Sequence, residues 1–194
     1  MLIMKLNKRD RVSKLFIEIA KEMILKDGIQ SVSVRKIADE AGYSYATIYN
    51  YFDDLSALLW AVKKDMIQDL IEWMKDINIS DLDGIKNVFH RYIEYYITYP
   101  NVFKFFYFYT LDVSIEEIEN EFNFNQLWNS TFSVIMVEYQ LTIKNIEVIS
   151  ICLIYSIHGI LTLHFSQNGS MNIQSICSEI DQIIDYCINR KGDL

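Results

Sequence analysis

The chain has 194 residues, of which 51% are hydrophobic and 23% charged, with 6 glycines and 1 proline. This length allows one large or two small domains with a real core, and the scarcity of glycine and proline favours an all-α fold. The net charge of −8 argues against a nucleic-acid partner for the chain as a whole, but in residues 1–60 the basic residues outnumber the acidic ones by one.

Three cysteines lie in apolar helical runs without C-x-x-C spacing: Cys152, Cys177 and Cys187. An odd number of such thiols fits a reducing compartment better than a disulfide framework. The apolar stretch at the N-terminus is too short for a signal peptide. We therefore expect a cytoplasmic protein, and the spacing suggests neither a metal site nor a cofactor.

The first predicted helix covers residues 8–26, where apolar side chains recur every three or four positions. Asp27 and Gly28 form a suitable C-terminal stop. Around its start the chain is locally basic, with Lys5, Lys8, Arg9, Arg11 and Lys14. These residues either reach phosphates or only solvate the beginning of the helix.

Residues 33–52, SVRKIADEAGYSYATIYNYF, predict two short helices joined by a tight turn. Gly42 supplies the backbone freedom that the turn needs, and Ser44 is a good N-cap whose hydroxyl can accept a backbone N–H. Ile48, Tyr51 and Phe52 can face the core. The outer face of the second helix is left with Tyr45, Ala46, Thr47, Tyr49 and Asn50. A helix-turn-helix places such a face in the DNA major groove.

The run GYSYATIYNYF, residues 42–52, resembles the signature of the TetR family of transcriptional regulators. That signature is roughly a Gly, a small apolar or aromatic residue, Ser, and then Thr-Leu-Tyr-x-Tyr-Phe. The resemblance extends upstream over residues 20–42. With the helical spacing, it implies an all-α fold of about nine helices. A three-helix DNA-binding domain would cover residues 1–55, and a helical effector-binding and dimerisation domain residues 56–194.

The resemblance also implies which residues contact DNA. From the first of the two helices Ser33 or Arg35 would bind a phosphate. From the second, Tyr45 and Ala46 would face base edges, Thr47 a phosphate or a thymine methyl, and Tyr49 a phosphate. Asn50 is suited to a bidentate bond with adenine and stands where the family often has His. The implied DNA-binding residues are Ser33, Arg35, Ser44, Tyr45, Ala46, Thr47, Tyr49 and Asn50.

The sequence departs from the family directly after Phe52. Family members commonly continue Lys-x-Lys-x-x-Leu, with the second Lys near a phosphate, whereas here two acids precede a leucine: Asp53, Asp54 and Leu55. The carboxylates can cap the next helix. They also weaken the attraction to DNA, so that backbone N–H groups at the start of that helix are expected to bind phosphate instead.

Downstream, helical spacing predicts helices over residues 55–74, from 81 to Pro100, and over 102–111, 114–140, 144–167 and 172–190. Ser114-x-x-Glu117 is a capping-box match at the start of the fourth. No Lys, Arg, Asp or Glu occurs from residue 148 to 178. That length permits a membrane span, but Ser150, His158 and Gly159 interrupt the run. A helix buried on all sides in a bundle explains it better, and we expect no membrane contact.

Aromatic side chains at 103–109 and on neighbouring helices predict a pocket for an apolar or aromatic effector, although any single ring suits an ordinary core equally. The step Tyr155-Ser-Ile-His158-Gly159 is similar to one in some family members. There His158 is either a ligand contact or a core histidine, and Gly159 would let helices approach closely. The candidate effector-binding residues are Tyr92, Phe103, Phe106, Tyr107, Trp128, Phe132, Tyr155 and His158.

The two final helices are apolar over more surface than one subunit covers, and the resemblance implies a homodimer through them. We interpret the chain as a ligand-responsive TetR-type repressor that binds a pseudo-palindromic operator and is released by its effector. No catalytic or nucleotide-binding pattern appears, so an enzyme is not expected. The alternative is a helical protein-interaction adaptor, made conceivable by Asp53, Asp54 and Leu55.

Overall fold

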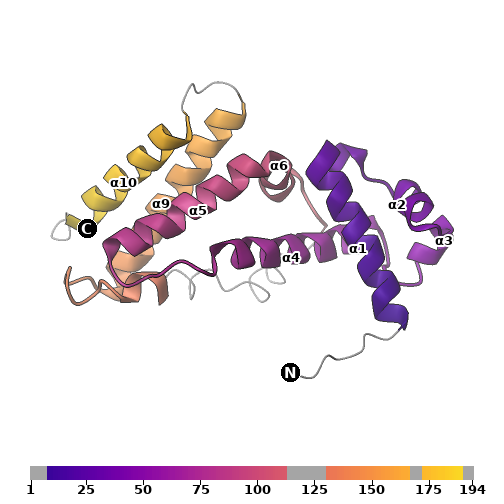
Figure 1. Ribbon diagram of the computed structural model, residues 1–194, viewed down its shortest axis with the longest axis horizontal. Coiled ribbons are helices and arrows are strands. Elements are labelled where there is room, and N and C mark those ends of the chain that lie inside the picture. The colour runs from indigo at the N-terminus through magenta and orange to yellow at the C-terminus, as the bar shows by residue number, and fades with distance from the viewer. Residues whose placement is uncertain (1–7, 113–129, 167–171, 190–194) are drawn as a thin grey trace. The chain divides into compact units, whose positions relative to one another are not determined.

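The computed structural model describes residues 8–112, 130–166 and 172–189 (Figure 1). Over these residues the chain forms eight α-helices, one 3-10 turn and no strand, which confirms the all-α class. It divides into two compact units, Met1–Ile71 with Tyr99–Ser114, and Glu72–Thr98 with Ile115–Leu194. The first unit therefore extends beyond the segment 1–55 and takes in most of the following helix and a later short one.

The first unit contains α1 (Lys8–Asp27), a 3-10 turn (Ile29–Ser31), α2 (Val34–Ala41), α3 (Tyr45–Ile48), most of α4 (Leu55–Met74) and α6 (Pro100–Phe108). The second contains α5 (Leu82–Thr98), α9 (Ile143–Phe165) and α10 (Ile173–Asn189). The helices expected at 8–26, 144–167 and 172–190 thus begin and end within two residues of α1, α9 and α10.

The core of the first unit is built around Phe16 of α1, which is completely buried. The rings of Tyr43 and Tyr51 approach it edge-on, with centroids 5.5 Å and 5.7 Å away. Ile37 of α2 and Ile48 of α3 are buried as well. Because Tyr43 precedes α3 and Tyr51 follows it, one side chain of α1 fixes both ends of that short helix.

Of the expected helix over 114–140, the structure describes residues 130–140. Its capping box, Ser114 and Glu117, lies outside the described residues. The prediction is wrong for residues 134–140, which form a succession of turns. Gln140 has φ +52, and the Leu141 N–H donates to the Met136 carbonyl at 2.8 Å, a pattern that closes a helix end.

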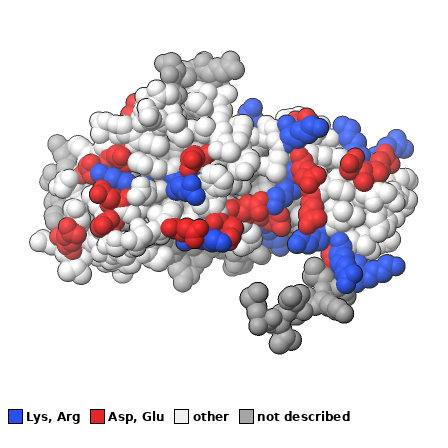
Figure 2. All heavy atoms as spheres, in the orientation of Figure 1, with Lys and Arg blue, Asp and Glu red and all other residues white. Residues whose placement is uncertain are grey.

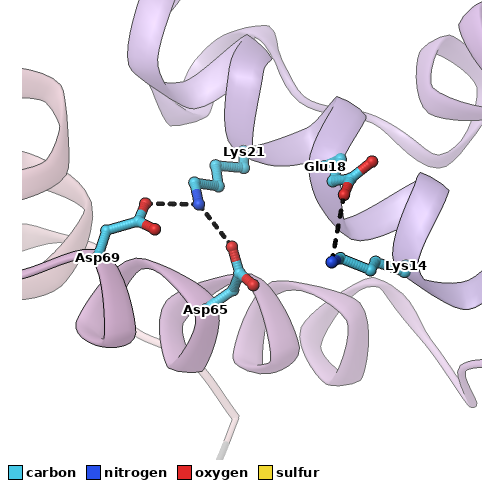
Figure 3. Close-up of polar contacts among 5 residues, drawn as sticks. All are labelled: Lys14, Glu18, Lys21, Asp65 and Asp69. Atoms are coloured by element: carbon cyan, nitrogen blue, oxygen red, sulfur yellow. Dashed lines mark hydrogen bonds and ion pairs between the residues drawn. The ribbon is translucent and has the colours of Figure 1, made fainter. Parts of the chain in front are cut away.

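An ion-pair cluster joins α1 to α4 within the first unit (Figure 3). The ammonium of Lys21 lies 2.6 Å from a carboxylate oxygen of Asp65 and 2.5 Å from one of Asp69. Burial by itself lowers the pKa of Lys21, but the hydrogen bonds and charges of the two aspartates outweigh it and hold the pKa above its usual value. Lys21 therefore stays charged and holds α4 against α1.

In the second unit α10 packs against both α5 and α9. Its buried side recurs every four residues: Ile176, Ile180, Ile184 and Ile188. Two polar contacts, Lys86–Asp185 and His90–Asp181, each at 2.7 Å, join α5 to α10. The loop before α5 also lies close to its first turn, because a Cβ added to Gly84 would come within 2.5 Å of the Asn78 carbonyl oxygen.

The burial on all sides expected for the apolar helix of 148–178 is only partly provided by the described part of one chain. α9 buries only one side, which includes Leu153, Ile157 and Leu161. On the opposite side Ile151, Tyr155 and Leu163 are each more than half exposed. No described atom lies within 4 Å of a Cβ added to Gly159, so this glycine makes no close helix contact within the described chain.

Replacing Lys21 with Met should lower the free energy of unfolding by about 1 kcal/mol, since two aspartates one turn apart then lose their shared counter-ion. Chemical denaturation measures the loss. Lys14→Met is the matched control, because Lys14 pairs only loosely with Glu18, at 3.7 Å, and both side chains are more than half exposed. Equal stability of the two variants would contradict the importance of this cluster.

Candidate nucleic-acid interface and effector site

A left-handed turn at Gly42 positions the two elements of the helix-turn-helix. Ser33 caps α2 by accepting a hydrogen bond from the Lys36 N–H at 3.3 Å. Gly42 has φ +73, and the Tyr43 N–H donates to the Ala38 carbonyl at 2.9 Å. A side chain at Gly42 would be strained in this conformation, so the glycine predicted for the turn is required by the backbone.

The second element presents large side chains to solvent. Tyr45 is 58% exposed and Tyr49 50%, and Ala46 and Asn50 are also exposed. Regular helix ends at Ile48, earlier than expected, and the next residues continue as a tightened turn in which the Asn50 N–H donates to the Thr47 carbonyl at 3.1 Å. The predicted outer face is therefore present, with Tyr49 and Asn50 on a turn.

The hydroxyl groups of Ser44 and Thr47 form a pair at the start of α3. Ser44 is at the N-cap position, as expected, but its side chain makes no capping bond to the backbone. Instead its oxygen lies 2.8 Å from the Thr47 hydroxyl oxygen. Since one of the two hydroxyl protons lies between these oxygens, the pair has a single proton left to donate. The three-residue spacing of two hydroxyl side chains is the sequence signal for this contact.

Exposed cations in the first unit supply positive charge around these elements. Figure 2 shows Lys and Arg gathered at the start of α1, where Lys8, Arg9 and Arg11 are exposed. Arg35 of α2 is exposed too. Lys36 instead turns its ammonium to the Ser31 carbonyl, at 3.0 Å.

At the start of α4 one of the backbone donors expected to bind phosphate is already occupied by a side chain. A carboxylate oxygen of Asp54 accepts the Ala57 N–H at 2.7 Å. Asp54 thus caps the helix, as predicted, and places a negative charge where an anion would otherwise bind. Asp53 beside it is exposed as well. The two carboxylates make this helix start less favourable for a phosphate.

Two of the predicted effector residues meet in the second unit. The Tyr92 hydroxyl lies 3.0 Å from Nε2 of His158. Burial lowers the pKa of His158 to about 4, so its imidazole is neutral at pH 7 and can accept the Tyr92 proton. Phe132 is completely buried in the same unit. An uncharged polar pair among rings suits a neutral hydroxyl or carbonyl group better than an ionised one.

The remaining predicted effector residues do not join this pair. Phe103, Phe106 and Tyr107 belong to α6 in the first unit, where Phe103 and Phe106 are buried. Tyr155 is 73% exposed, and Trp128 lies outside the described residues. An open hollow of about 510 Å³ in the second unit is lined by residues between Asp76 and Arg91, none of them among the predicted set.

Sequence reasoning did not single out Lys63, whose ammonium donates to the Phe106 carbonyl at 3.2 Å. Burial lowers the pKa of this lysine. The sequence signal that could have identified Lys63 is its position on α4, one residue after the buried Val62 and three before the buried Met66. A cation at that spacing has to turn toward the core and find an acceptor there.

Residues 16–62 match the family model described as "Bacterial regulatory proteins, tetR family". The match spans the buried Phe16, the whole helix-turn-helix and the first turns of α4. No curated protein sequence matches the chain significantly.

Solved structures share the fold over most of the chain. RolR in complex with resorcinol is 14% identical, with a TM-score of 0.68, over 94% of this chain and 95% of that one. A TetR transcriptional regulator from Rhodococcus sp. RHA1 is 16% identical, with a TM-score of 0.59, over 94% and 99%. The regulator FadR from Bacillus subtilis, in complex with stearoyl-CoA, is 16% identical, with a TM-score of 0.64, over 90% and 97%. At such identities the likeness is one of fold.

Replacing Asp54 with Asn should tighten binding to duplex DNA roughly 2- to 10-fold at low salt, because the amide oxygen still caps α4 while the negative charge is gone. Fluorescence anisotropy with a labelled duplex measures the change. Asp76→Asn, which removes an exposed charge from the second unit, should leave the affinity unchanged. An Asp54→Asn protein with wild-type affinity would show that this carboxylate does not face DNA.

Acidification from pH 7 to pH 5 should lower the free energy of unfolding by about 1–2 kcal/mol through His158. The unfolded histidine binds a proton near pH 6.5, whereas the folded one, with its pKa near 4, does not. Stability is therefore complete above about pH 6.5 and is lost as the pH falls toward 4. His158→Gln, which retains His90 and His164, should show a flatter profile in urea denaturation. Identical profiles for the two proteins would refute the assignment.

Proposed function

Because this chain belongs to the TetR family of bacterial regulatory proteins, we propose that it is a ligand-responsive repressor that binds a pseudo-palindromic operator as a homodimer. The observation that carries the proposal is the second helix-turn-helix element. Tyr45, Tyr49 and Asn50 stand exposed on a segment whose two ends are held by Phe16. Large exposed rings on so short an element fit a groove-reading surface.

The proposed effector is a small apolar or aromatic molecule that carries an uncharged polar group. The Tyr92–His158 pair supports this choice, since both groups are neutral at pH 7 and surrounded by rings. Two proteins of the same fold were solved with an organic ligand, resorcinol in one and stearoyl-CoA in the other. Effector binding is proposed to weaken operator affinity about 5- to 150-fold, the range of typical coupling energies.

The dimer is proposed to form through α9 and α10. α9 is apolar and long enough to span a membrane. Only 33% of its most apolar 18-residue stretch is buried within the chain, so most of this stretch needs another cover. Its exposed ridge repeats every four residues: Ile151, Tyr155, Gly159 and Leu163. Ridges of this spacing are the ones by which two helices interdigitate, and a glycine within the ridge allows close approach. A second copy would cover this surface in a cytoplasmic, non-catalytic regulator.

The proposal is tested with purified protein and the DNA upstream of its own gene, together with duplexes selected from a random pool. We expect a footprint of two half-sites about one helical turn apart and an affinity that falls steeply with salt. Tyr49→Ala should abolish the footprint. A folded dimer that binds no duplex at low salt would overturn the repressor assignment in favour of the protein-interaction adaptor.

Replacing Gly159 with Arg should weaken dimerisation at least ten-fold, because the new side chain places bulk and charge on the proposed contact ridge. The fold of the protomer should survive, since a Cβ at this position meets no described atom within 4 Å. Sedimentation over a concentration series measures the effect. Asn87→Arg, at an exposed site on α5, is the matched control. An unchanged dimer in Gly159→Arg would place the interface elsewhere.

A further inference from the structure

Arg9, in the first turn of α1, contacts the end of the second helix-turn-helix element. This element, residues 45–50, is called the reading element. Its Nη2 donates a hydrogen bond to the backbone carbonyl of Asn50 at 3.2 Å, and the bond is exposed to solvent. Its guanidinium carbon lies 6.0 Å from the centre of the Tyr51 ring. Asn50 and Tyr51 directly follow Tyr49, so this arginine holds the turn that carries two of the predicted base and phosphate contacts.

The guanidinium retains donors after making this contact. An arginine carries five N–H donors in a rigid fork, and the bond to Asn50 uses one of them. The side chain is exposed, which leaves the rest of the fork open to a second acceptor beside the reading element. A phosphate is the acceptor that such a fork matches in both geometry and charge.

The start of α4 is unfavourable for a phosphate. Asp54 occupies the Ala57 N–H there with its own carboxylate, and the exposed Asp53 beside it adds a second negative charge. Lys36 directs one of its three donors to the Ser31 carbonyl, and within the described chain its side chain makes no hydrogen bond with α3 or the turn after it. Arg9 is the described cation that bonds directly to the reading element while exposing the remainder of its charge.

The geometry points to Arg9 as a phosphate clamp that grips one DNA phosphate and the Asn50 carbonyl together, and so sets how the turn of Tyr49 and Asn50 sits in the groove. This inference rests on the proposed function. It moves the principal phosphate contact from the beginning of α4 to the beginning of α1. The clamp acts both as a DNA contact and as a positioning residue for the turn.

The test compares salt dependence in three proteins, using a duplex selected by the wild type from a random pool. Arg9→Met should weaken binding roughly 10- to 100-fold at 0.1 M salt and reduce the slope of log K against log salt by about 0.9 per protomer. Arg9→Lys should keep nearly the wild-type slope, since its charge remains. Its affinity should still fall, because a single nitrogen cannot bridge the phosphate and the Asn50 carbonyl.

Lys26→Met is the matched control, because it removes one exposed cation from the last turn of the same helix. It should leave the slope and the affinity near wild type. Thermal unfolding of each variant checks the fold, and an exposed contact such as that of Arg9 should shift the midpoint by only a few degrees. A loss of affinity caused by misfolding would appear in that measurement, whereas a reduced salt slope would not follow from it.

The inference is overturned if Arg9→Met and Lys26→Met give the same slope and affinity, or if Arg9→Lys binds as tightly as the wild type. The first result would mean that Arg9 contributes only general charge, and the second that the Asn50 contact has no effect on binding. A wild-type protein that binds no duplex would instead remove the proposed function, and this inference with it.

Discussion

The burial of Phe16 is the constraint on which the DNA-reading segment depends. A helix as short as α3 has little stability of its own, because the first turn of any helix is costly to form. Phe16 supplies the missing order by contacting a ring on either side of α3, Tyr43 before it and Tyr51 after it. Large side chains can then face solvent from a short segment whose conformation α1 determines. Through Phe16, the first helix of the chain therefore positions the residues that are proposed to touch bases.

Acidic residues of the first unit are placed at the beginning and along the middle of α4. At its beginning Asp54 satisfies a backbone donor and repels anions, and farther along Asp65 and Asp69 share Lys21 of α1. Acidic residues therefore serve the stability of α4 and its attachment to α1. Exposed cations also lie on α1 and α2, among them Arg9 and Arg35. In the proposed regulator these cations would supply the attraction to DNA, although residues 1–60 carry almost no net charge.

Local features of the sequence were sufficient to predict most of the described helices and the turn at Gly42, because caps, glycine conformation and apolar spacing act within a few residues. The contacts that could not be predicted join positions far apart, such as Arg9 with Asn50 and Lys21 with Asp65, since their distance depends on the packed unit. The aromatic residues show the same limit. Composition revealed that rings were abundant, but only the fold shows that α6 and α5 contribute theirs to different compact units.

The one-sided burial of α9 could not be predicted from composition either. The sequence of an apolar helix has the same composition whether the rest of the chain or a partner covers it. Ile151, Tyr155 and Leu163 remain in water on the described chain. In the proposed dimer, operator occupancy at low copy number would vary with the square of the protomer concentration. A modest change in the expression of such a gene would then switch its target far more sharply than a monomeric regulator could.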